Sequence, residues 1–363
     1  MTDVATPSEH LPPPQNTWGE WIWKNFFGSV SNTLFTLAFG VFVVWVLSSV
    51  ADWMVLDAVW RVEHRDLCGH GAGACWAVIE DRWRLIFFGL YPYEEQWRSS
   101  IACLALALTI VLSCVPKFWS VQRLPVLWLA GFSVFFALMR GGFAGLTLVT
   151  TEQWGGLSLT LFIFASVFLI GMPLAVVFAL ARRSSFPVIA KGMGLFIDVV
   201  RSLPLLAILF SAAVVVPILV PDWLQGSKLA RVIVAFAVFF AAYQAEIIRA
   251  GLQSLSEGQE EAALSLGMPY WSVILDILMP QAFRSTLPST INQAVITFKE
   301  TSIVTVIGFF EVMASGKAVI GTDEWGAQFV EIYVFLGLVY FVFVFGLSRY
   351  GAWLEKRMRV GHG

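Results

Sequence analysis

Two adjacent charged residues, Lys299 and Glu300, lie near the middle of a largely apolar stretch and could bind a polar ligand there. An ionisable group at the centre of a membrane helix costs about 2.5–3.5 kcal/mol, so such groups usually mark a ligand pathway or a charged partner. A zwitterionic ligand needs a cation for its carboxylate and an acceptor for its ammonium group. Together with the polar residues Asn292, Thr301 and Ser302, these two residues form the candidate pathway.

The same charges fit a second interpretation, in which Lys299 pairs with Asp198 or Glu246 and holds neighbouring spans together. We favour this interpretation over ligand contact. Asp198 with Arg201, and Glu246 with Arg249, also stand three residues apart near the ends of their spans. Ordinary salt bridges along a helix face are the favoured explanation for these two pairs. An inner gate built from these charges is the alternative.

A polar segment contains His64, Cys68, His70 and Cys75, a spacing that could bind Zn²⁺. The segment is expected outside the cytoplasm, where an oxidising environment favours a disulfide between Cys68 and Cys75. Unpaired thiols are the third possibility. We therefore predict a disulfide and no metal site, and none of the three alternatives would make the segment catalytic.

Composition places the chain in a membrane, because 58% of its 363 residues are hydrophobic and only 13% are charged, against roughly 25% charged in soluble domains. The apolar runs are long enough to cross a bilayer, which takes about 20 residues per helix. Strands of a membrane barrel would alternate over about half that length. The sequence therefore predicts an all-α polytopic bundle in contact with membrane lipid. A net charge of −2 argues against a nucleic-acid partner.

Apolar runs separated by polar breaks predict about eight membrane helices, at 29–50, 101–116, 123–140, 157–181, 194–220, 229–250, 284–308 and 328–349. Pro204 is expected to bend the fifth of these spans. The chain should divide near residue 150. We expect a disordered tail at 1–28, a three-span extension at 29–150 with an external loop at about 51–98, a five-helix core at 151–355 with a long loop at about 251–283, and a tail at 356–363.

Lys and Arg in the short loops predict the orientation, because cytoplasmic loops carry an excess of them. The loops with Arg182, Arg183 and Arg284 would be cytoplasmic, and both termini would lie on that side. The loop at about 51–98 disagrees, since it holds five arginines and is nevertheless assigned outside. Its interspersed acidic residues indicate a small folded cap.

The predicted cytoplasmic loop between the sixth and seventh spans reads Glu261-Ala262-Ala263, then Gly267, then Ile277, Met279 and Pro280. This spacing resembles the EAA loop of ABC-type import permeases, with Met279 in the place of a leucine. Alanines among good helix formers give a thin helix that can enter a groove closely, and Gly267 supplies the turn that ends it. An amphipathic helix lying on the membrane surface is the alternative. The resemblance implies docking on a separate ATPase through a coupling loop formed by Glu261, Ala262, Ala263, Gly267 and Pro280.

Three further segments resemble polar amino-acid permeases of the histidine/glutamine type. Asp198 and Arg201-Ser202-Leu203-Pro204-Leu205 are similar to the pattern E/D-x-x-R-G-T-P-L, although Ser202 and Leu203 depart from it. The segment from Tyr243 to Gly251 is similar to Y-x-A-E-I-x-R-x-G, and Lys299 to Ile303 is similar to K-D/E-T-S-L. The resemblance covers about residues 155–355. With its extra N-terminal spans, the chain most resembles the M subunit of the general L-amino-acid ABC transporter.

The resemblance implies a type I ABC importer permease, which moves polar L-amino acids into the cytoplasm by alternating access and is not itself an enzyme. The nearest candidate for a phosphate-binding loop, Gly316-Lys317, has Glu311 where the first glycine belongs and Ala318 where the hydroxyl belongs. We therefore expect no cofactor in this chain, with ATP and Mg²⁺ on a partner. The implied setting is the bacterial inner membrane. Expected partners are a homologous permease chain in a heterodimer, two ATP-binding subunits and a periplasmic amino-acid-binding protein.

Other functions fit the sequence less well. An ion-coupled secondary carrier also explains charges within the membrane, but it predicts inverted repeats and gives the EAA loop no role. A membrane-embedded enzyme would need a convergent catalytic set, yet all four histidines lie outside the predicted spans. An ABC permease for another small polar solute would share the EAA loop but not the other three segments.

Overall fold

The computed structural model describes residues 17–68, 73–120 and 122–359. Every regular element in these ranges is a helix, and β pairing is limited to isolated bridges. The all-α fold expected from the composition is confirmed. The chain forms two compact units, one ending at Ala77 and the other starting at Val78.

The first unit contains one long apolar helix with short helical segments before and after it. Its elements are α1 (Trp18–Ile22), η1 (Trp23–Phe27), α2 (Val30–Ala51), η2 (Asp52–Leu56) and η3 (Val62–Leu67). Thr17 and Glu20 form a reciprocal capping box at the start of α1, which satisfies backbone groups that a helix end otherwise leaves unpaired. The expectation of a disordered tail up to residue 28 is therefore wrong from Thr17 onward. Residues 1–16 lie outside the described ranges.

The polar segment after α2 is folded. Cys68 and Cys75 are joined by a disulfide, which leaves neither thiolate for a metal ion. The indole N–H of Trp76 donates a hydrogen bond to the Met54 carbonyl at 2.8 Å. His70, the other histidine of the zinc alternative beside His64, lies outside the described residues.

The second unit is a bundle of long helices with short segments at both ends. Its elements are α3 (Ala77–Phe88), η4 (Tyr93–Glu95), α4 (Gln96–Ser113), η5 (Pro116–Phe118), α5 (Arg123–Arg140), α6 (Gly156–Arg182), α7 (Pro187–Ser202), α8 (Leu205–Phe210), η6 (Ser211–Val215), α9 (Val216–Leu219), α10 (Asp222–Gln225), α11 (Lys228–Gln253), α12 (Glu257–Ser265), α13 (Tyr270–Ser272), η7 (Val273–Leu278), α14 (Met279–Glu300), η8 (Thr301–Ile307), α15 (Val312–Ile320) and α16 (Phe329–Arg359).

Helices α6 and α11 form the centre of this bundle. Gly171 of α6 lies against the ring of Phe240 of α11, where any side chain on the glycine would collide with that ring. On the other side of α6, Phe162 stacks on Phe135 of α5 with 4.9 Å between ring centroids. The apolar core thus continues from the five-helix region into α4 and α5. Because of this packing, α4 and α5 belong to the same compact unit as the five-helix region, and the boundary between the two units falls at Ala77–Val78 and not near residue 150.

The described residues contain six helices that are long and apolar enough to cross a bilayer, and the bent pair of α7 with α8–α9 adds a seventh. The pair bends by 101° between Ser202 and Leu205, at the place expected from Pro204, which cannot donate a helical hydrogen bond. Helix α14 has 22 residues, or about 33 Å at 1.5 Å per residue, and is the most polar long helix. Counting it gives the expected number of about eight spans.

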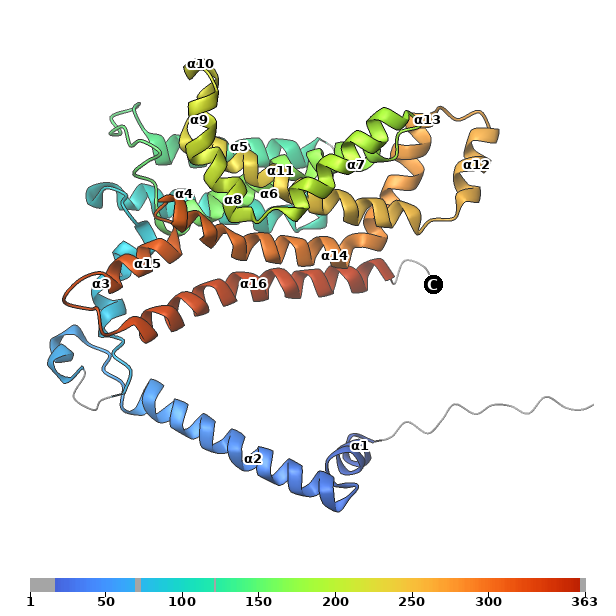
Figure 1. Cartoon of the computed structure of the whole chain (residues 1–363). Coiled ribbons are helices and arrows are strands. Elements are labelled where there is room, and N and C mark those ends of the chain that lie inside the picture. The colour runs from blue at the N-terminus through green and yellow to red at the C-terminus, as the bar shows by residue number, and fades with distance from the viewer. Residues whose placement is uncertain (1–16, 69–72, 121, 360–363) are drawn as a thin grey trace, which may run out of the picture. The chain divides into compact units, whose positions relative to one another are not determined.

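Figure 1 shows α6, α11, α14 and α16 running alongside one another in the second unit, as their contacts also require. Helix α12 projects from one end of this bundle, and α9 and α10 lie near the opposite end. We call these the α12 end and the α10 end. The charged residues singled out in α6, α7 and α11 gather at the α12 end.

Candidate functional site

Helix α12 carries the EAA motif and ends at a glycine turn. Gly267 has a φ of +79°, a left-handed conformation that glycine adopts without steric cost. The Gly267 N–H donates to the Leu264 carbonyl at 2.9 Å, and the Met268 N–H donates to the Ala263 carbonyl at 3.2 Å. These two bonds satisfy carbonyl groups that the helix end would leave unpaired. The role expected of Gly267 as the end of this helix matches this geometry.

Most of α12 is exposed. Ala263 is the one buried residue of the helix, and it packs among apolar residues of α11, η7 and α14. Glu261 and Ala262 are exposed, and Leu266, just after the helix, is 83% exposed. Pro280 lies in the first turn of α14, directly after the π-helical segment η7. Ala263 is thus the one apolar anchor of the helix, and most of its other side chains face outward.

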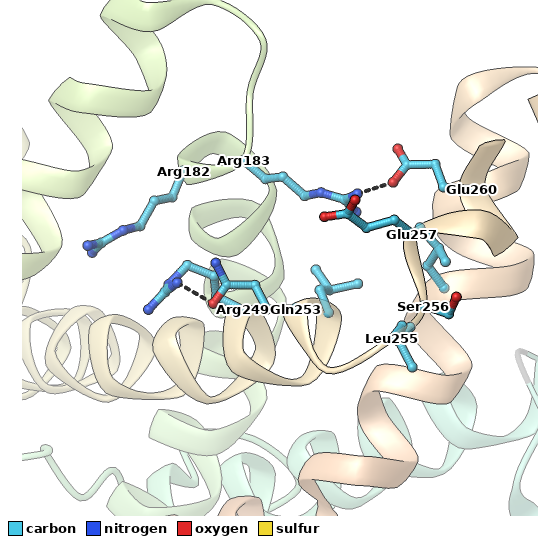
Figure 2. A pocket seen from close by; sticks show the side chains of 10 residues that line it. Arg182, Arg183, Arg249, Gln253, Leu255, Ser256, Glu257 and Glu260 are labelled. Atoms are coloured by element: carbon cyan, nitrogen blue, oxygen red, sulfur yellow. Dashed lines mark hydrogen bonds and ion pairs between the residues drawn. The ribbon is translucent and has the colours of Figure 1, made fainter.

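A charged pocket of about 520 Å³ lies between α12 and the ends of α6 and α11. Figure 2 shows Arg183, the residue that follows α6, reaching Glu260 of α12, with which it forms an ion pair. Arg249 of α11 donates to the Gln253 side chain at 2.7 Å on the opposite wall. The pocket therefore has cationic walls from the membrane helices and an acidic wall from α12.

Beside this pocket, three arginines surround Glu246 of α11. Its carboxylate lies 2.9 Å from Arg182, 2.8 Å from Arg249 and 3.8 Å from Arg201. The Glu246 side chain is only 14% exposed, so water screens these charges less than at a surface. We call these four residues the Glu246 cluster, and it connects α6, α7 and α11.

The cluster corrects two pairings expected from the sequence. Asp198 pairs with Arg182 at 3.2 Å and not with Arg201, whose guanidinium lies 5.2 Å from the ring centre of Tyr243. Lys299 forms no ion pair with Asp198 or Glu246 in the described part of the chain, and both carboxylates pair instead with arginines at the α12 end. The pair expected between Glu246 and Arg249 is present.

A second pocket, of about 640 Å³, lies between α11 and α14 on the far side of the cluster. Arg201, Tyr243 and Glu246 contribute to its wall. Several hydroxyl groups, which sequence reasoning missed, complete the lining: Ser254, Ser285, Thr286 and Ser289. Their spacing could have revealed them, because Ser285, Ser289 and Asn292 stand at i, i+4 and i+7 on α14 and therefore share one face of the helix. We call this space the hydroxyl pocket.

Asn292 and Lys299 continue this face along α14, and both side chains are exposed. Lys299 lies ten residues beyond Ser289, about 15 Å along the helix. Glu300 is half-buried, and one of its carboxylate oxygens is buried without a hydrogen-bond partner among the described residues. Asn292 and Lys299 therefore share the exposed face, whereas Glu300 points into the bundle.

The other two predicted pathway residues bond to the backbone. The Thr301 hydroxyl donates to the Phe298 carbonyl at 2.7 Å, and the Ser302 hydroxyl donates to the Lys299 carbonyl at 2.8 Å. Hydroxyl groups near a helix end commonly satisfy carbonyls in this way. The structure therefore does not bring the five predicted residues together as one site.

A second polar centre lies toward the α10 end, around Glu311. This residue is fully buried at the start of α15. Its carboxylate accepts hydrogen bonds from the Thr305 hydroxyl at 2.7 Å, the Ala314 N–H at 2.9 Å and the Tyr340 hydroxyl at 3.1 Å. The Thr160 hydroxyl adds a fourth at 3.3 Å. Glu311 thus joins α6, η8, α15 and α16. Sequence reasoning missed this role, although an acidic residue just before a helix is a common cap.

The region that carries both pockets and α12 matches a known family. Residues 171–360 correspond to the family described as "Binding-protein-dependent transport system inner membrane component". The chain belongs to this family. It is therefore a permease subunit of a transport system and not an enzyme, and membership implies an ATPase and a solute-binding protein as partners.

Relatives align with this permease over two different lengths. The "Inner membrane amino-acid ABC transporter permease protein YhdY" of Escherichia coli K12 is 37% identical over 99% of both chains. The "Glutamate/glutamine/aspartate/asparagine transport system permease protein BztC" of Rhodobacter capsulatus is 30% identical over 97% of this chain and 96% of that protein. The "Glutamate/aspartate import permease protein GltK" of E. coli O6:H1 is 37% identical, but over 56% of this chain and 91% of its own length. The expected resemblance to amino-acid permeases is confirmed.

A solved structure titled "Crystal structure of an amino acid ABC transporter with histidines" is 30% identical to the permease. The alignment covers 56% of this chain and 92% of that chain, with a TM-score of 0.49.

Proposed function

We propose that this permease carries polar L-amino acids into the cytoplasm and is driven by ATP hydrolysis on two separate subunits. The exposed helix α12 carries this proposal, because it buries only Ala263 although it connects two membrane helices. Leu264 of this helix and Leu266 just after it are exposed. A thin helix with apolar side chains facing outward fits a cleft on a partner protein, which would cover this surface.

The exposed polar face of α14 supports a pathway shared with a second permease chain. Ser285, Ser289, Asn292 and Lys299 are exposed on it, and a face of this kind is unfavourable against lipid. A homologous chain packed against α14 would enclose a polar passage with the hydroxyl pocket at its α12 end. We propose a heterodimer, as the resemblance of the extra N-terminal spans implies.

Lys299 is the proposed contact for the carboxylate of the amino acid. Its alternative partners, Asp198 and Glu246, are occupied by arginines, and the Lys299 side chain is exposed on the polar face of α14. The candidate pathway also includes Glu300, Asn292, Thr301 and Ser302. Of these, Asn292 shares the exposed face and could accept from the ammonium group.

The arginines at the α12 end support an orientation with this end in the cytoplasm, together with both termini. A periplasmic amino-acid-binding protein would then deliver its ligand at the α10 end. Alternation of access between the two ends would require the α12 end to open and close, and the Glu246 cluster beside the hydroxyl pocket is the proposed inner gate.

Uptake by the complete transporter in proteoliposomes tests the proposal. Replacing Ala262 by Phe should abolish ATP-dependent uptake of amino acids, because a bulky ring on the exposed face of α12 would block close docking. Ala262→Ser, which keeps the side chain small, is the control and should retain uptake. Unchanged uptake with Ala262→Phe would contradict the proposed role of α12.

The solute contact has its own test. Lys299→Gln should raise the KM for amino-acid uptake at least about tenfold, since a charge-assisted contact is worth about 1.5–3 kcal/mol. Lys299→Arg should keep most of the affinity. A KM that is the same in all three proteins would remove Lys299 from the pathway.

The remaining alternative is an ABC permease for a different small polar solute. The relatives named above are described as proteins for amino acids, glutamate and aspartate among them, which favours an amino acid here. An ion-coupled carrier has no support, because the family is one of binding-protein-dependent systems.

A further inference from the structure

Two consecutive arginines at the end of α6 bind acidic residues on different elements. Arg183 pairs with Glu260 of α12. Arg182 pairs with Glu246 of α11 at 2.9 Å and with Asp198 of α7 at 3.2 Å. Because the two arginines are neighbours in the backbone, a displacement of one must move the other. One short segment therefore connects α12 to the Glu246 cluster.

These pairs are partly shielded from water. The Arg183 and Glu260 side chains are 32% and 25% exposed, and those of Arg182 and Glu246 are 23% and 14% exposed. One guanidinium nitrogen of Arg183 is also buried without a hydrogen-bond partner in the described chain. Loss of Glu260 would leave a partly buried cation without its acidic partner, which is a larger perturbation than breaking a pair on the surface.

Few other contacts fix α12 in place. Ala263 is its one buried residue. A hydrogen bond from Gln281 to Gln259 at 2.8 Å connects α12 to α14, but it is neutral and exposed. The ion pair with Arg183, drawn in Figure 2, adds a charged link from α12 to the residue that follows α6.

We propose that the pairs Glu260–Arg183 and Arg182–Glu246 act as an ionic relay that transmits a displacement of α12 to the hydroxyl pocket. This inference rests on the proposed function, in which the ATPase moves α12. Arg201, Glu246 and Arg249 of the cluster line the hydroxyl pocket, so a shift of Arg182 changes the charge distribution at its wall. Arg182, Arg183 and Glu260 are positioning residues in this scheme and do not contact the solute.

The number of amino acids taken up per ATP hydrolysed, measured with the complete transporter in proteoliposomes, tests the relay. Glu260→Gln and Arg183→Gln should leave ATP hydrolysis active but lower this ratio about fivefold or more, the lower range of typical coupling between sites. Gln259→Ala, which breaks the neighbouring neutral contact to α14, should stay within about twofold of the wild-type ratio, because an exposed neutral hydrogen bond contributes little. The double variant Arg183→Glu with Glu260→Arg restores an ion pair and should recover most of the ratio.

Three results would overturn the relay. The first is a wild-type ratio in both single variants. The second is an equal loss in Gln259→Ala, which would mean that any disturbance of α12 has the same effect. The third is a double variant no better coupled than the weaker single variant. If a single variant fails to assemble with its partners, the ratio measured for the double variant tests the relay instead. An absence of ATP-driven uptake by the wild-type transporter would instead contradict the proposed function itself.

Discussion

The carboxylate of Glu246 lies 2.9 Å from the guanidinium of Arg182, and this pair joins the two central helices α6 and α11. Arg249 at 2.8 Å and Arg201 at 3.8 Å bring two more cations to the same carboxylate. Asp198 offsets part of this positive charge through its own pair with Arg182. Glu246 is therefore the anion that the three arginines share.

Glu246→Gln should destabilise the permease, because it leaves three arginines close together without their shared anion. We expect a loss of about 1–3 kcal/mol, below the value for a fully buried pair because the arginines are partly solvated. The unfolding midpoint of the purified permease in detergent measures this change. Asp198→Asn is the matched control, and it should shift the midpoint less because Asp198 is 58% exposed. Equal shifts in the two variants would contradict the central role of Glu246.

Gly267→Ala should weaken the end of α12 through its backbone alone. A Cβ at this position would meet no atom within 4 Å, but a non-glycine residue at positive φ costs about 1–2 kcal/mol. ATP-dependent uptake should therefore fall, with less ATPase bound to the permease. Gly258→Ala, inside α12, is the control: alanine favours a helix by about 0.5–1 kcal/mol over glycine, so this variant should retain uptake. If both variants behave alike, the turn at Gly267 is not what uptake requires.

Glu311→Ala should destabilise the α10 end, because the carboxylate caps α15 and accepts bonds from three hydroxyl groups. Losing the cap and leaving the half-buried hydroxyls of Thr305 and Tyr340 without this acceptor should cost about 2–4 kcal/mol. Tyr340→Phe removes one of these bonds and should cost about 1 kcal/mol. Unfolding midpoints of the two variants, compared in one detergent, check the order. A smaller loss for Glu311→Ala than for Tyr340→Phe would refute it.

The disulfide between Cys68 and Cys75 predicts a simple labelling pattern. Neither cysteine should react with an alkylating reagent until the protein is reduced, and mass spectrometry of the peptides reads out both. Replacing both cysteines by serine should cost the segment about 2–3 kcal/mol, as expected for closing a short loop. Proteolysis between α2 and α3 should then accelerate, while the unfolding midpoint of the second unit stays unchanged. Alkylation of Cys68 without reduction would disprove the pairing.

Several features could be predicted because they are encoded locally. Helix α12 and its end follow from alanines between good helix formers and a glycine that tolerates positive φ. The bend in the fifth span follows from Pro204, which lacks the N–H that a continuous helix needs. Its angle of 101° could not be predicted, because proline removes a hydrogen bond but packing sets the direction of the next helix.

The charged partners could not be predicted in the same way. Spacing of three residues indicated pairs for Glu246 with Arg249 and for Asp198 with Arg201, and only the first forms. Arg182 reaches Asp198 and Glu246 from another helix. The local sequence does not indicate which helix will pack beside these two carboxylates. For the same reason, the sequence could not show that Asp198 and Glu246 pair with arginines and not with Lys299.

The sequence by itself determined that this protein is an all-α membrane permease of the ABC type, with a short helix before the glycine turn at Gly267, since hydropathy, helix signals and motif spacing depend only on neighbours along the chain. The tertiary structure decided which charges meet, where the hydroxyl pocket opens and that α4 and α5 share a core with α6. Those features depend on which helix faces pack together, and packing brings together residues that are far apart in the sequence.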